Sequence, residues 1–96
     1  MKVLHVDSGR QMRGGQWQTF YLGMGQKTLG LVPLLLAPAK SPLFALAAER
    51  GLACMALTWR NLWRESRTHD LTHAHDARSH TMAALGSLVA GVSHEG

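Results

Sequence analysis

The sequence of 96 residues contains a single cysteine, and only 17% of its residues are charged. Cys54 therefore has no partner for an internal disulfide, which excludes the small secreted folds that disulfides hold together. Long apolar runs are also missing, because the longest candidate, 31–39, contains two prolines and is far shorter than the roughly 20 residues that span a bilayer. His5 and Asp7 interrupt the apolar start before the core of a signal peptide could form. These absences predict a cytoplasmic location.

The composition predicts one small folded domain. Hydrophobic residues make up 46% of the chain, which is too many for a disordered tail, and 96 residues are too few for two domains. The formal net charge of +4 is a modest excess that many enzymes carry. The basic residues are scattered, apart from a helical stripe of Arg60, Arg64 and Arg67, for which a solvated face is favoured over contact with an anionic surface. No nucleic-acid partner is expected.

Short β-rich runs alternate with helical patterns along the chain. The predicted strands are 2–6, 31–37, 53–57 and 71–75, and the predicted helices begin near 16, 42, 59 and 79 and end near 29, 50, 67 and 90. In the first helix Trp17, Phe20 and Tyr21 recur at helical spacing. In the third helix Leu62 and Trp63 are expected to point inward.

Turn and capping residues support these boundaries. Ser41 followed by Pro42 is typical of a helix N-cap with a first-turn proline. Gly30 and Gly51 are expected to end the first and second helices. Pro33 must lie near the start of its strand, because an interior strand cannot lose an amide donor.

Alternation of strand and helix with short connections predicts an α/β fold. We expect a partial doubly wound, parallel, Rossmann-like sheet of about four strands in the order 3-2-1-4, with right-handed crossovers. Ligands bind such sheets beyond the carboxyl ends of the strands, where the strand order reverses. The loops after the first and fourth strands are therefore the candidate binding regions, and both are unusually polar.

The loop after the first strand is rich in glycine. Gly9 and Gly14 have the spacing of a phosphate-binding P-loop, but Gly15 and Gln16 stand where that motif requires Lys and Ser or Thr, which excludes a nucleoside triphosphatase of that kind. A Gly14–Gly15 pair at a helix N-terminus can bind an anion or a sugar hydroxyl through free amides. The same glycines are equally expected of a simple turn that needs positive φ.

The loop after the fourth strand follows a cluster of histidines. His73 and His75 would share one face of a strand and could chelate zinc. However, Asp76 follows His75 directly, which breaks the metallo-β-lactamase spacing, and an amidohydrolase needs a barrel of about 250 residues. We therefore expect no metal. His73 is expected to point inward and His69 to be solvated.

His75 and Asp76, at the end of the fourth strand, are expected to face a ligand. Asp76 is also placed to cap the following helix.

Three ordered stretches together resemble the N-terminal domain of family 4-like glycosyltransferases with the GT-B fold. They are KVLHVDSG at 2–9 followed by RGGQ at 13–16, SPL at 41–43 followed by AERGL at 48–52, and DLTHAHDARSH at 70–80. Their order and spacing match the family along nearly the whole chain.

The resemblance implies a retaining transfer of sugar from a nucleotide sugar, with this domain on the acceptor side of a cleft between two domains. The donor is a substrate, and neither a metal nor another cofactor is implied. The acceptor would be a glycan or lipid of the cell envelope, with peripheral contact at the inner membrane surface. The residues expected to bind substrate are Gly14, Gly15, Gln16, His75, Asp76 and Arg78.

The sequence also departs from the family. Gly30 is followed by Leu31-Val32-Pro33 where the family usually has Gly-His-Glu-Val before the second strand. We also expect the donor-binding C-terminal domain to be missing, because these residues hold only part of an N-terminal domain. We therefore expect the chain to be inactive alone and to need a C-terminal domain, for example as a partner chain. With no fifth strand covering the fourth, marginal folding or oligomerisation is expected. The alternatives are a non-catalytic module that binds sugar, phosphate or a partner and, less favoured, a zinc-binding protein.

Overall fold

The computed structural model describes residues 1–76, 79 and 81–83, in which strands and helices alternate. In chain order the elements are β1 (Lys2–Val6), α1 (Gly14–Thr28), β2 (Val32–Ala37), α2 (Pro42–Glu49), β3 (Cys54–Ala56), α3 (Trp59–Ser66) and β4 (Leu71–Ala74). Ser79 and residues 81–83 are also helical, and the rest of the predicted helix 79–90 lies outside the described residues. None of the helices in the described ranges is long and apolar enough to cross a membrane.

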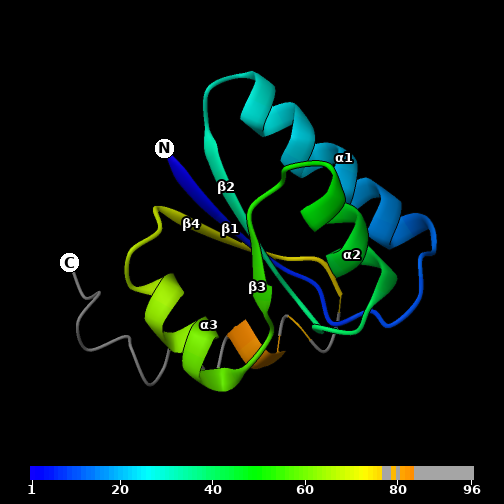
Figure 1. Cartoon of the computed structure of the whole chain (residues 1–96). Coiled ribbons are helices and arrows are strands. Elements are labelled where there is room, and N and C mark those ends of the chain that lie inside the picture. The colour runs from blue at the N-terminus through cyan, green and yellow to red at the C-terminus, as the bar shows by residue number, and fades with distance from the viewer. Residues whose placement is uncertain (77–78, 80, 84–96) are drawn as a thin grey trace.

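The four strands form one parallel sheet in the order β3-β2-β1-β4, so the predicted α/β architecture and strand order are confirmed. After β3 the chain crosses back over the sheet to place β4 beside β1. The register pairs Leu4 with Leu34 and His5 with His73. Helices α1 and α2 cover one face of the sheet and α3 lies on the other (Figure 1).

Each face of the sheet carries its own apolar cluster, because successive strand residues point to opposite faces. On β2, Leu35 and Ala37 face α1 and α2, whereas Leu36 faces α3. The first cluster comprises Phe20, Leu35, Ala37, Leu43, Ala47 and Leu52. The second comprises Leu4, Val6, Leu36, Leu62 and Met82. The named residues of both clusters are buried, so apolar packing on both faces stabilises this short sheet.

The turn chemistry expected from the sequence is confirmed. Ser41 Oγ accepts a hydrogen bond of 3.2 Å from the Phe44 amide at the start of α2, and Pro42 occupies the first turn. Gly30 and Gly51 adopt positive φ angles of 87° and 77° after α1 and α2, a conformation that glycine reaches without strain. Both helices therefore end where these glycines reverse the chain.

The expectation that Trp63 points inward is wrong, and the aromatic residues of α1 are buried only in part. Trp63 is exposed, with the Arg67 guanidinium 4.5 Å from its ring centroid. Because Trp63 follows Leu62 by one residue, it lies about 100° further around α3 and cannot share the face that Leu62 buries. On α1 only Phe20 of the aromatic pattern is buried, while Trp17 and Tyr21 stack on each other in solvent.

Candidate functional site

The loops that follow β1 and β4 meet at the carboxyl edge of the sheet. Backbone hydrogen bonds continue past the strands, from the Asp7 amide to the Leu36 carbonyl (3.0 Å) and from the His75 amide to the Val6 carbonyl (2.9 Å). The chain crosses over between β3 and β4, so the strand order reverses between β1 and β4. This is the position at which parallel α/β sheets bind ligands.

Asp7 holds the β1 loop against α1. Its carboxylate is completely buried and accepts hydrogen bonds from Thr19 Oγ1 (2.8 Å), Gln16 Nε2 (3.0 Å) and the Gly9 amide (2.9 Å). In the sequence Asp7 stands out only as a charged residue that ends the first apolar run. Its position as the first acidic residue after a buried strand was the available signal, but its three partners come from tertiary structure.

Asp76 joins the two loops. Its carboxylate accepts hydrogen bonds from the amide and hydroxyl of Ser8 (both 2.8 Å) and from the amide (2.7 Å) and hydroxyl (3.0 Å) of Ser79. Burial by itself would raise the pKa of this carboxyl, but the bonds from Ser79 and Ser8 outweigh burial and lower the pKa to about 2. The predicted helix-capping role of Asp76 is confirmed, and a role in positioning the β1 loop is added to it.

Gly14 and Gly15 form the first turn of α1. Among the described residues, the glycines with positive φ are Gly30 and Gly51. Gly14 and Gly15 are therefore not in a turn that needs positive φ, and that interpretation of the pair is wrong. A Cβ atom on either residue would meet no atom within 4 Å. The first amides of a helix have no partner within it. Both glycines are exposed, so solvent reaches this first turn.

The side chain of Gln16 connects this turn to the buried carboxylate. Its Oε1 accepts from the Arg13 amide (3.2 Å), while its Nε2 donates to Asp7. A Cβ atom on Gly9 would overlap the Gln16 amide group, so any side chain there would displace that group from Asp7. Gln16 thus fixes the loop between β1 and α1.

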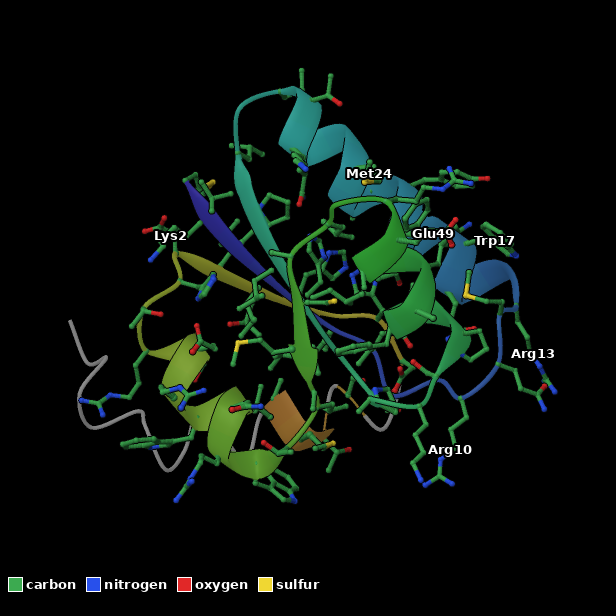
Figure 2. All side chains as sticks on the ribbon, in the orientation of Figure 1. Lys2, Arg10, Arg13, Trp17, Met24 and Glu49 are labelled. Carbon is green, nitrogen blue, oxygen red and sulfur yellow. The ribbon has the colours of Figure 1, made fainter. Side chains whose placement is uncertain are left out.

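Basic side chains border hollows at this edge. Gly9, Arg10, Gln11, Arg13 and Gln16 line a hollow of about 290 Å³. Figure 2 shows the side chains of Arg10 and Arg13 extending outward from the loop. The sequence analysis did not single out Arg10, because one arginine among scattered basic residues gives no pattern.

Arg10 also borders a larger hollow of about 430 Å³ at the carboxyl ends of β2 and β3. Lys40, Ser41 and Thr58 contribute to the same lining. Two neighbouring hollows thus share one arginine, and each carries a second basic residue.

Three histidines lie together on the face of the sheet that α1 covers. His73 and His75 share this face, as predicted, with ring centroids 4.0 Å apart. His5, which the sequence analysis did not connect with them, pairs with His73 in the β1–β4 register and is almost completely buried. Two predictions about single histidines are wrong. His73 is exposed and does not point inward. His69 is half-buried and not solvated, because its Nδ1 lies 2.7 Å from the Glu65 carbonyl oxygen.

Hydrogen bonds fix the protonation pattern of this cluster. His5 Nε2 donates to Gln26 Oε1 (2.6 Å), so Nδ1 of the neutral ring accepts from His75 Nε2 at 2.8 Å. Burial, followed by the neighbouring imidazoles of His73 and His5, lowers the pKa of His75 to about 4. Burial likewise lowers the pKa of His5. Both rings are uncharged at neutral pH.

The predicted site residues therefore separate into three groups. Gly14, Gly15 and Gln16 lie at the open edge, and Asp76 supports that edge through Ser8. His75 directs its ring into the histidine cluster. Arg78 lies outside the described residues.

The arginine stripe of α3 makes contacts within its own helix. Arg64 donates to Glu65 (3.1 Å) and to Asn61 Oδ1 (2.7 Å), and Arg67 covers the ring of Trp63. These contacts fit the solvated face favoured above.

No model of a known protein family matches the sequence, and no curated protein matches it significantly. Solved structures do match. The crystal structure of Anabaena Alr3699/HepE in complex with UDP aligns with 95% of this chain at a TM-score of 0.80 and 15% identity. The complexes of HepE with UDP-glucose and with UDP and glucose both give a TM-score of 0.79, at 15% and 14% identity.

The aligned region is only 27% of the HepE chain in the UDP complex. This chain thus spans about a quarter of the HepE chain that it matches. At such low identity the likeness establishes the fold, which is the Rossmann-like α/β arrangement present in that part of the UDP-binding HepE.

Proposed function

We propose that this chain is part of a retaining glycosyltransferase that uses a nucleotide sugar as donor, and that the carboxyl edge of its sheet forms the acceptor side of the reaction cleft. The observation that carries the proposal is the match over 95% of the chain to HepE, which was solved with UDP-glucose and with UDP and glucose. UDP-glucose is a sugar donor, and UDP and glucose are the two molecules into which its hydrolysis divides it. The donor-binding half would come from a C-terminal domain, in the same protein or as a partner chain.

The charge at the edge suits a sugar diphosphate. When the bond to the sugar breaks, negative charge grows on the leaving phosphate, and donors fixed in advance around it lower the barrier. Arg10 and Arg13 border the hollow beside the first turn of α1, where the helix dipole is positive. Gly14 and Gly15 have no side chains to block approach to the amides.

The buried network gives this edge a fixed shape. Asp7 and Gln16 hold the β1 loop on α1, and Asp76 holds Ser8 of the same loop on β4. A loop that is already ordered loses little entropy when a ligand binds. Direct contact of His75, Asp76 and Arg78 with the substrate remains part of the proposal. So do an acceptor of the cell envelope and a cytoplasmic location at the inner membrane surface.

A second candidate function is a non-catalytic module that binds a sugar or a phosphate. The hollow of about 430 Å³ favours it, because Arg10, Lys40, Ser41 and Thr58 line it without help from another chain. Hydroxyl and cationic side chains are suitable donors for both ligand types.

Amide NMR spectra of the ¹⁵N-labelled chain, titrated with UDP, UDP-glucose and glucose separately, test the proposal. We expect saturable shifts of the Gly14 and Gly15 amides with UDP-glucose or glucose. Arg13→Gln should weaken the response, whereas the control Arg60→Gln on α3 should leave it unchanged. The absence of saturable shifts with all three ligands would refute binding by this edge of the sheet, and the transfer assay below then decides whether the chain is part of a transferase.

A transfer assay separates the two candidates. The protein encoded by the complete reading frame that contains these residues should release UDP from UDP-glucose or another nucleotide sugar when acceptors are supplied. Binding at Gly14 and Gly15 without transfer from any nucleotide sugar would favour the non-catalytic module.

A further inference from the structure

We propose that His5, His73 and His75 bind one divalent transition-metal ion, and that zinc is the ion whose preferred ligands they match. The cluster lies on the α1 face of the sheet and is separate from the hollows that Arg10 borders. His75, for which substrate contact is proposed above, is the one residue that this cluster shares with the proposed sugar site.

The sheet itself assembles the three ligands. Parallel register places His73 opposite His5 on the neighbouring strand, and His75 follows on the same face because strand side chains alternate. One ring nitrogen from each residue lies within 4.8 Å of the other two. Tetrahedral zinc with bonds of 2.0–2.1 Å requires nitrogens about 3.3 Å apart. The nitrogens therefore have to move closer together when the ion binds, and the proposal assigns this movement to rotation of the side chains.

Gln26 orients the buried ligand. By accepting the Nε2 proton of His5 at 2.6 Å, it leaves the Nδ1 lone pair directed toward the other two rings. A histidine that binds a metal almost always donates its second ring N–H to an oxygen acceptor, which fixes its tautomer and its orientation. This feature is present at the one ligand that solvent does not reach.

In the structure His75 Nε2 donates its proton to that lone pair. A metal ion would take the place of the shared proton. The proton would move to Nδ1 of His75, so the ring would remain neutral and present Nε2 to the ion.

The burial gradient leaves one side of the cluster open. His5 is 1% exposed, His75 is half-buried and His73 is exposed. A metal ion held by three imidazoles would keep its fourth position on the solvent side, where water or another ligand can bind. Imidazole favours zinc, copper and nickel, whereas magnesium and calcium require oxygen ligands. Three neutral nitrogens without an oxygen therefore select against the hard cations.

Because the ligands come from both β1 and β4, the ion would cross-link these strands. It would stabilise the folded chain in proportion to its affinity, because the unfolded chain does not hold the three rings together. The ion would therefore hold the edge of the sheet together next to the loops that Asp76 joins.

Titration calorimetry on the full chain, produced without a polyhistidine tag and freed of metal with EDTA, tests the proposal. Zinc should bind with one equivalent per chain and raise the thermal midpoint, and magnesium should do neither. Cobalt, used as a spectroscopic probe, should give the visible absorption of a tetrahedral site.

Four variants locate the ligands. His73→Ala and His75→Ala, at positions that solvent reaches, should abolish the one-equivalent zinc binding while retaining the fold by circular dichroism. Gln26→Ala should weaken zinc binding by about 10- to 100-fold. His69→Ala is the matched control, since its ring contacts α3 instead, and it should bind zinc as the wild type does. Absence of stoichiometric zinc binding, or binding that survives both His73→Ala and His75→Ala, would overturn the proposal.

Discussion

Replacing Asp7 measures how strongly the buried network holds the β1 loop. In Asp7→Ala, Thr19 Oγ1 can still donate to the Gly15 carbonyl at 3.0 Å, but the Gly9 amide and Gln16 Nε2 lose their acceptor. An unsatisfied donor costs about 1–3 kcal/mol, and water can reach these half-buried groups, so we expect a loss of about 3 kcal/mol in the free energy of unfolding. That is a large fraction of the roughly 5–15 kcal/mol that stabilises a typical domain.

Asp7→Asn provides the matched comparison. The asparagine oxygen can accept from Gly9 and Gln16, and its amide can donate to Thr19 Oγ1, so the loss should be about 1 kcal/mol or less. Urea unfolding followed by tryptophan fluorescence measures both variants. The reasoning would be refuted if Asp7→Ala remained within about 1 kcal/mol of the wild type, or if the two variants were equally destabilised.

Three further predictions concern pH, packing and backbone space. Since the pKa of His75 falls from 6.5 to about 4 on folding, the unfolded chain takes up the proton first. The contribution of His75 to the free energy of unfolding should be complete above pH 6.5 and should be lost as the pH falls toward 4. With solvent screening included, the loss should be about 1–3 kcal/mol. Urea titrations at several pH values should show a smaller decline for His75→Gln. Leu62→Ala should cost about 3 kcal/mol of unfolding free energy and Trp63→Ala less than about 1, whereas equal losses would contradict the burial pattern. Gly9→Ala should lower the thermal midpoint by displacing the Gln16 amide, whereas Gly14→Ala, with open space around it, should not.

Local signals in the sequence were sufficient for most of the fold. The alternation of apolar runs predicted the strands of the sheet and their parallel order. Ser41 and Pro42 marked the start of α2, and Gly30 and Gly51 marked the ends of α1 and α2, because each of these roles depends on one or two residues and their backbone geometry. Helical spacing alone did not show how wide the buried stripe is, which is why Trp63 was misplaced.

The candidate site could be predicted only in part. Gly14 and Gly15 have a local signature, whereas the partnership of Asp76 with Ser8 joins residues 68 positions apart. The pairing of His5 with His73 likewise depends on strand register, which no short motif encodes. The sequence could therefore show which residues carry chemistry, but their partners emerged only from the assembled sheet.

The strand order has a consequence for how the chain folds as it is synthesised. β1 leaves the ribosome before the other three strands, yet its neighbours in the sheet are β2 and β4, and its pairing with β4 joins Val3 to Leu71. Parallel pairing offers no hairpin, so such distant contacts form slowly and only after the intervening chain has emerged. Until then one edge of the first strand lacks its partner, and a chaperone or a second nascent chain can bind it. The histidine cluster and the Asp76 link can thus form only after β4 has emerged.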